Sequence, residues 1–164
     1  MENTKTLYEL DMIGFLGPLI VVLVNVYNLL VQPVYLAGYV LSLLVNSVIN
    51  MLLKSYIQES RPYNSINIVT FDTHRGADIY GMPSGHAQSV AFSTMYIYLV
   101  QKSMWVLMLD MIILSLTVLQ RWNYRKHTIY QLSIGCIIGA AVGYISYTVI
   151  KKIAETPTKT HNIL

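Results

Sequence analysis

Two basic residues near the middle of the sequence, Lys54 and Arg61, have a spacing that could bind an anion. If one helix continued through both, their side chains would lie two turns apart on one face, about 10 Å along the axis, and both could reach one anion. Pro62 disfavours helical geometry at Arg61 and therefore predicts that the helix ends there. Taken alone, the pair is more typical of cations that end a transmembrane helix at the lipid headgroups.

A second candidate is the stretch Pro83-Ser84-Gly85-His86, directly before an apolar run. A helix that begins here leaves backbone N–H groups free, and a helix N-terminus beside a glycine is a ready anion site. Ser84 can cap the helix or donate to a phosphate oxygen, Gly85 admits a close backbone approach, and His86 titrates in a range that suits proton transfer. The alternative is a serine cap beside an incidental interfacial histidine, and the stretch alone does not decide between them.

The third candidate joins Arg121, His127 and Gln131. Arginine can hold a phosphate with two hydrogen bonds, and an unprotonated imidazole can attack phosphorus. Gln131 lies one helical turn after His127, so its amide oxygen can accept the ring N–H and fix the reactive tautomer. The alternative is a basic loop that faces anionic lipid, a role that Arg125 and Lys126 also fit.

The elements that must position these residues are membrane helices. Of the 164 residues, 54% are apolar and only 12% are charged, which is too few charges for an ordinary soluble domain. Because a helix needs roughly 20 apolar residues to cross a bilayer, we predict one all-α, polytopic membrane bundle over residues 1–164, with 151–164 as a mobile tail. The predicted spans are residues 12–32, 34–53, 86–101, 103–119 and 128–150.

Five spans bring the three candidates to one membrane face, because the chain changes sides at every crossing. That face then holds two histidines, three cations and a glycine-containing turn. Phosphoryl transfer through a covalent intermediate needs this combination of a nucleophile, an acid and several charge stabilisers. The convergence therefore favours an enzyme over helix capping. The remaining basic residues divide evenly between the faces, so they do not predict an orientation.

In this order, the motifs Lys54-x6-Arg61-Pro62, Pro83-Ser84-Gly85-His86 and Arg121-x5-His127 resemble the three-part signature of the type 2 phosphatidic acid phosphatase superfamily. The resemblance covers about residues 34–150. It implies the helical core that these membrane phosphatases share with vanadium haloperoxidases, and a mechanism without metal or other cofactor.

The resemblance also implies a role for each matching residue. His127 would be the nucleophile that forms a phosphohistidine, and His86 the acid that protonates the leaving oxygen. The phosphoryl oxygens would be held by Lys54, Arg61, Ser84, Gly85 and Arg121.

Two glutamines depart from the commonest form of the signature. Gln120 stands where a serine usually precedes the arginine, and Gln131 stands where an aspartate usually supports the nucleophilic histidine. A neutral amide orients the ring but cannot stabilise a developing imidazolium as a carboxylate does. The dolichyl-diphosphatase-like and glucose-6-phosphatase-like branches also carry glutamine at the second position, so Gln131 indicates a branch. Five spans are one fewer than is usual in the family.

A site at the headgroup level favours a lipid phosphate as substrate. The branch favours a polyprenyl or dolichyl diphosphate, followed by a phosphatidate-like lipid, and the family implies a lumenal or extracytoplasmic site. The long polar connection over residues 54–85 can contribute to substrate choice or only anchor the protein at the interface. Its candidates are Tyr63, His74, Arg75 and Tyr80.

The rival hypotheses are a catalytically silent protein that binds phospholipid, and a structural membrane protein of the same fold. The net charge of +3 is modest, and we expect no nucleic-acid partner. Gly135, Gly139 and Gly143 form a small-residue stripe that can serve either internal helix packing or a homo-oligomer.

Overall fold

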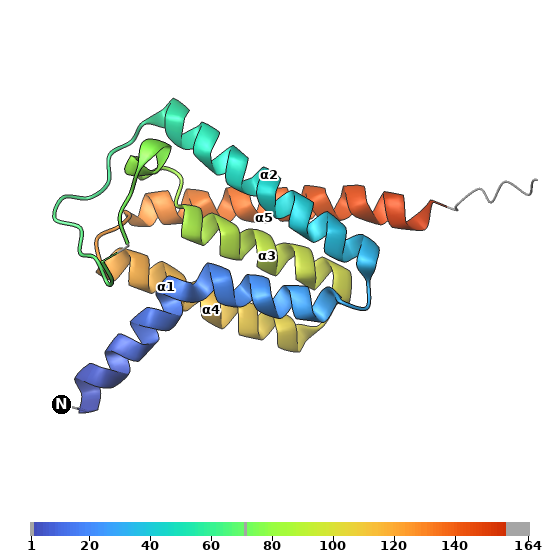
Figure 1. The fold of residues 1–164 in the computed structure, drawn as a ribbon, viewed down its shortest axis with the longest axis horizontal. Coiled ribbons are helices and arrows are strands. Elements are labelled where there is room, and N and C mark those ends of the chain that lie inside the picture. The colour runs from blue at the N-terminus through green and yellow to red at the C-terminus, as the bar shows by residue number, and fades with distance from the viewer. Residues whose placement is uncertain (1, 71, 157–164) are drawn as a thin grey trace, which may run out of the picture.

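In the computed structural model, five α-helices form one bundle (Figure 1). The structure describes residues 2–70 and 72–156, and the side chains from residue 8 onward within these ranges. The described part contains no strand, which agrees with the predicted all-α bundle. The helices are α1 (Glu2–Leu29), α2 (Pro33–Ile57), α3 (Gly85–Gln101), α4 (Met104–Asn123) and α5 (Ile129–Glu155), with a short 3-10 helix, η1 (Gly76–Ile79), before α3.

Four helices are long and apolar enough to cross a bilayer, namely residues 8–29 of α1 and the whole of α2, α4 and α5. Helix α3 has 17 residues, at the lower limit of a spanning helix. It lies at the centre of the bundle and contacts each of the other four helices (Figure 1). The helix that begins with the Pro83-Ser84-Gly85-His86 stretch is therefore the one around which the others pack.

Two helix boundaries differ from the sequence predictions. Helix α2 ends at Ile57, because Gln58 adopts a left-handed conformation with φ of 52°, so the predicted helix end at Arg61 is wrong. Helix α5 continues to Glu155, so residues 151–155 are helical although they were assigned to the tail. Of the rest of the predicted tail, Thr156 caps the helix, and residues 157–164 lie outside the described residues.

Helices α3 and α5 pack with their backbones in close contact. A Cβ atom on Gly135 would lie 2.7 Å from the carbonyl oxygen of Ser84, and one on Gly143 would lie 2.6 Å from that of Phe92. Gly139 fits α3 as tightly. The small-residue stripe thus serves internal packing, the first of its two predicted uses. A homo-oligomer through these residues stays a prediction.

A buried amide network fixes α2 to α3 below the site. Asn50 Nδ2 donates to Gln88 Oε1 at 2.7 Å, and Gln88 Nε2 donates to Asn46 Oδ1 at 2.9 Å. Asn50 Nδ2 also lies 3.3 Å from the Pro83 carbonyl oxygen. Because buried amides without partners are costly, these mutual bonds fix the position of the α3 N-terminus relative to α2.

The connection between α2 and α3 covers the end of the bundle where α2 and α4 end and α3 and α5 begin (Figure 1). Its backbone is tied down at several points. Ile66 N–H donates to the Tyr124 carbonyl at 2.9 Å, and Gly81 N–H donates to the Glu59 carbonyl at 2.7 Å. The described parts of the connection, residues 58–70 and 72–84, therefore form a cap over this end of the helices.

Candidate active site

The three predicted motifs meet at this covered end of the bundle. Lys54 is in the last turn of α2, Ser84 and Gly85 begin α3, and Arg121 is near the end of α4. Burial, followed by the positive charges of Arg61, Arg121 and Lys54, lowers the pKa of His127. These four side chains are thus close enough to interact electrostatically, as the parity of the spans predicts.

Lys54 and Arg61 share one anion, which is a carboxylate of the same chain. Lys54 Nζ and Arg61 Nη2 each lie 3.2 Å from Asp78 Oδ1, and His74 Nδ1 lies 2.6 Å from Asp78 Oδ2. Burial alone would raise the pKa of Asp78, but the hydrogen bond from His74 and the charges of Lys54 and Arg61 hold it well below its usual range. Asp78 therefore occupies, as an anion, the place predicted for a phosphate.

The N-terminus of α3 presents an unpaired donor beside this ion cluster. Ser84 is the N-cap residue, but its side chain makes no capping hydrogen bond, and its fully buried Oγ has no partner within the described residues. Its N–H donates to the Gln131 carbonyl at 3.1 Å, which joins α3 to α5. A buried hydroxyl without a partner is free to donate to an oxyanion.

Arg121 is fully buried in α4 and has spare donor capacity. Its Nη1 lies 3.3 Å from Asp72 Oδ1, whereas its Nε has no partner in the described part of the chain. Gln120, which stands in place of the family's serine, packs against Gly14 of α1 and its amide makes no hydrogen bond to a described residue. The Arg121 guanidinium is thus positioned to bind an anion, but the Gln120 amide makes no hydrogen bond to this guanidinium.

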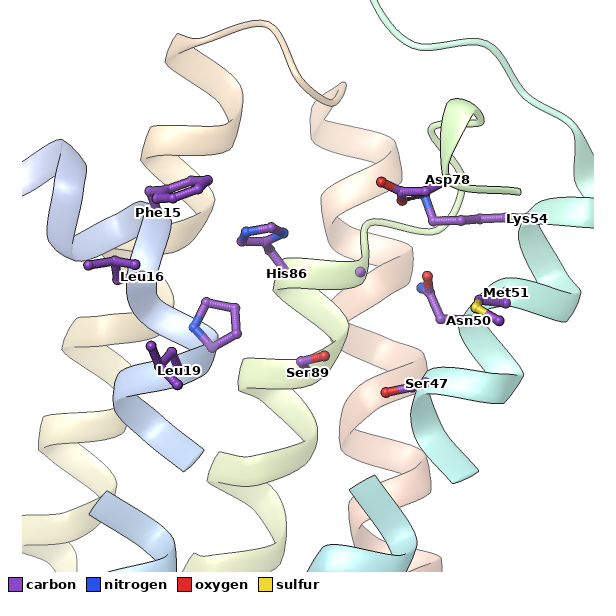
Figure 2. Close-up of a pocket in the computed structure, with 12 residues that line it drawn as sticks. Phe15, Leu16, Leu19, Ser47, Asn50, Met51, Lys54, Asp78, His86 and Ser89 are labelled. Atoms are coloured by element: carbon purple, nitrogen blue, oxygen red, sulfur yellow. Dashed lines mark ion pairs between the residues drawn. The ribbon is translucent and has the colours of Figure 1, made fainter. Parts of the chain in front are cut away.

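A cavity of about 500 Å³ opens beside His86 (Figure 2). Lys54, Asp78 and Gly85 line its polar end, while Leu16 and Leu19 of α1 belong to its apolar wall. Figure 2 shows His86 between α1 and α2, with Asp78 and Lys54 together at the same end of the cavity. The cavity therefore joins a charged end to an apolar wall between two membrane helices.

The hydrogen bonds of His127 define its tautomer. Arg61 Nη1 lies 2.9 Å from His127 Nε2, and because a guanidinium can only donate, this nitrogen is unprotonated. The other nitrogen, Nδ1, carries the proton and faces two acceptors, the Gly81 carbonyl at 2.9 Å and Gln131 Oε1 at 3.3 Å. Gln131 contacts the ring as predicted, but the nearer acceptor, Gly81, was not predicted.

The two histidines line two different cavities. His127 lines a separate hollow with Pro62 and Tyr63, whereas Asp78 lines the cavity of His86. Asp78 binds Arg61, and Arg61 in turn binds His127 Nε2. The path from the His86 cavity to His127 Nε2 thus leads through this ion pair, which an anion entering from the cavity would have to displace.

Sequence reasoning missed a second ion cluster that anchors the connection to the site. Lys126 is buried, not lipid-facing, and its Nζ lies 3.0 Å from Asp72 Oδ2 and also donates to Asn67. Arg121 binds the other oxygen of Asp72. Burial by itself would raise the pKa of Asp72, but Arg121 and Lys126 outweigh it and lower the pKa. The sequence signal that could have revealed this cluster is the acidic residue Asp72 in the polar connection, which is predicted to lie at the same membrane face as the basic motif over residues 121–127.

Comparison with known proteins places this arrangement in a family. The profile of the PAP2 superfamily matches residues 35–155. Among solved structures, the chain resembles the crystal structure of the first transmembrane PAP2 type phosphatidylglycerolphosphate phosphatase from Bacillus subtilis, with a TM-score of 0.67 and 18% identity over 93% of this chain and 79% of that one. A comparison with curated proteins found no match. At 18% identity, the structural likeness shows the fold alone. The family match, however, covers most of the chain, and together with the membrane helices it supports a phosphatase. We conclude that this membrane protein belongs to the PAP2 superfamily.

Proposed function

We propose that the protein removes a phosphate from a lipid phosphate or diphosphate through a phosphohistidine on His127. The observation that supports this best is the ring of His127, which is buried with Nε2 unprotonated and directed at a cation cluster. Burial and the neighbouring cations lower its pKa, so the ring stays a nucleophile throughout the neutral pH range. Following the family, we place the site on the lumenal or extracytoplasmic side.

In the proposed first step, the lone pair of His127 Nε2 forms a bond to phosphorus while the bond from phosphorus to the leaving oxygen breaks. Burial and the charge of Arg121 lower the pKa of His86 to about 3, so in this proposal His86 takes up its proton when the negatively charged phosphate binds beside it. It then donates this proton to that oxygen, which departs as the lipid alcohol or lipid monophosphate. Lys54, Arg61 and Arg121, with the Ser84 hydroxyl and the Gly85 N–H, stabilise the charge on the phosphoryl oxygens.

In the proposed second step, water attacks phosphorus and the bond from phosphorus to Nε2 breaks. His86 takes the proton from this water, and inorganic phosphate leaves. His127 keeps its Nδ1 proton throughout, held by the Gly81 carbonyl and Gln131. The cycle balances without metal or redox chemistry.

The cavity beside His86 supports a lipid as the substrate. Its apolar wall on α1 and its position between membrane helices fit a hydrocarbon tail, and Lys54 and Asp78 at its polar end fit a phosphate. Polyprenyl diphosphate is the favoured substrate, because the branches that the sequence resembles carry glutamine at position 131. A phosphatidate-like lipid is second, and the phosphatidylglycerolphosphate of the similar structure belongs in the same panel.

The test is phosphate release by the purified protein in detergent with EDTA present. We expect release from polyprenyl diphosphate first, from phosphatidate and phosphatidylglycerolphosphate more slowly, and from water-soluble phosphate esters least. A preparation of the His127→Ala variant controls for contaminating phosphatases. If the wild-type protein binds anionic lipid vesicles but hydrolyses none of these substrates, the silent phospholipid-binding protein is the better description.

Replacing Asp78 by asparagine should lower the KM for lipid phosphate by about tenfold, because the carboxylate competes with phosphate for Lys54 and Arg61 and only the unoccupied fraction of sites can bind. Inhibition by inorganic phosphate should strengthen by a similar factor, and kcat should change little. Initial rates over a range of substrate and phosphate concentrations measure both. A raised KM would show instead that Asp78 is needed to position the two cations.

A further inference from the structure

Glu59 lies behind the proposed nucleophile, His127, on the side of the ring that faces Gln131. We propose that Glu59 is a positioning residue for His127, and that it stabilises the charge on the ring through the amide of Gln131. The inference rests on the proposed phosphohistidine chemistry. It explains how a chain with glutamine at position 131 can still place a carboxylate behind its nucleophile.

The first connection runs through side chains. Gln131 Nε2 donates to Glu59 Oε1 at 2.7 Å and to the Ser60 carbonyl at 2.9 Å. Gln131 Oε1 faces His127 Nδ1 at 3.3 Å and accepts from Thr128 N–H at 3.2 Å. Because a carboxylate and a carbonyl can only accept, the amide has a single orientation that satisfies all four partners. Its oxygen is therefore held against the ring N–H of the histidine.

The second connection runs through the backbone. The Glu59 carbonyl accepts from Gly81 N–H at 2.7 Å, and the Gly81 carbonyl accepts from His127 Nδ1 at 2.9 Å. A Cβ atom on Gly81 would lie between 2.5 and 2.7 Å from the amide atoms of Gln131, so the two acceptors of Nδ1 also pack against each other. Glu59 thus fixes both groups that hold the proton of His127.

The chemical consequence concerns the covalent step. When Nε2 bonds to phosphorus, the imidazole becomes positively charged, and a carboxylate behind Nδ1 stabilises that charge. Here the Glu59 carboxylate acts on the His127 ring through the Gln131 amide. The hydrogen bond that this amide donates to Glu59 and the one that it accepts from the ring polarise the amide in the same direction, so each strengthens the other. The effect should be smaller than that of a direct carboxylate, since the charge is farther away and Glu59 is only partly buried.

The test begins with Glu59→Gln, which keeps an acceptor for Gln131 but removes the charge. We expect kcat, and the single-turnover rate of phosphohistidine formation, to fall by about tenfold with little change in KM, the lower end of the loss seen when the partner behind a metal-ligating histidine is removed. Glu155→Gln is the matched control, because Glu155 ends α5 and pairs only weakly with Lys151 at 3.7 Å. This control should match the wild type.

A rescue separates a charge effect from a structural one. Gln131→Asp places a carboxylate directly beside His127, so adding Glu59→Gln in that background should cost less than about twofold, as expected for residues that act through one another. An equal loss in both backgrounds would overturn the proposal, as would a fully active Glu59→Gln variant. Glu59→Asp, which withdraws the carboxylate by one methylene, should show a partial loss of kcat and gives a second test if Glu59→Gln does not fold.

The proposal and the proposed function fail in different ways. If wild-type protein and His127→Ala release phosphate equally, the phosphohistidine chemistry itself is wrong. If release requires His127 but the Glu59 variants with intact folding show wild-type kcat, only the role of Glu59 is wrong. Thermal unfolding of each variant in the same detergent establishes the intact fold.

Discussion

The His127→Ala variant should release phosphate from its best lipid substrate at least about 10⁴ times more slowly than the wild type, because removal of the nucleophile leaves only binding and charge stabilisation. The KM should change much less than kcat, since the cations that bind phosphate remain. Initial rates give this comparison. With radiolabelled substrate, acid-labile label should be trapped on the wild-type protein and be absent from the variant.

The His86→Ala variant is the informative companion to this experiment. It keeps the nucleophile, so labelled phosphoenzyme should still form from a diphosphate, whose leaving group is a stable phosphate anion. Formation from a phosphate monoester should suffer more, because an alkoxide leaving group needs the proton. Equal release by wild type and His127→Ala would contradict the mechanism, and so would labelled His127→Ala protein.

Replacing Arg61 by lysine should lower kcat/KM by about 10² to 10³, although the positive charge is kept. Burial lowers the pKa of Arg61 to about 10, so the side chain is charged at neutral pH. Its guanidinium donates at once to the Asp78 carbonyl at 2.8 Å, the Lys126 carbonyl at 3.0 Å and His127 Nε2 at 2.9 Å. A lysine ammonium cannot hold two loop segments and a phosphate together.

The matched control is Lys152→Arg. Lys152 is exposed in the last turn of α5, at the end of that helix away from the site, and this conservative change should leave kcat/KM unaltered. Because Arg61 also ties loop segments together, thermal unfolding of both variants must accompany the kinetics. A folded Arg61→Lys protein with wild-type kcat/KM would show that the side chain serves the loop and not the phosphate.

The fold could be predicted from the sequence because its main determinants are local. Apolar runs of spanning length fix the helices, and the alternation of sides at each crossing brings the three motifs together without any knowledge of packing. The position of the α2 terminus could not be predicted in this way. The chain turns at Gln58 in a left-handed conformation, and glutamine carries no signal for it.

The parts of the site that were missed all depend on the path of the α2–α3 connection. That segment has neither helical nor strand periodicity, so the sequence does not indicate which of its carboxylates meet which cations. Asp78 reaches Lys54 across 24 positions and Glu59 reaches Gln131 across 72. Lys126 illustrates the same limit. A basic residue in a polar loop is predicted to be exposed, and only the structure shows that Lys126 is buried against its partner Asp72.

The glycine contact between α3 and α5 has a mechanical consequence. With no side chain between the two backbones, the residues of α3 and α5 that flank the site belong to a single stiff unit. Helix α1, which contains Pro18, packs mainly on α4 and also on α3, where the Phe15 ring lies against the His86 ring with 5.9 Å between the ring centroids. A lipid tail that shifted α1 would therefore also shift the surroundings of His86, so the shape of the tail and the action of the proposed acid would be coupled through this one helix.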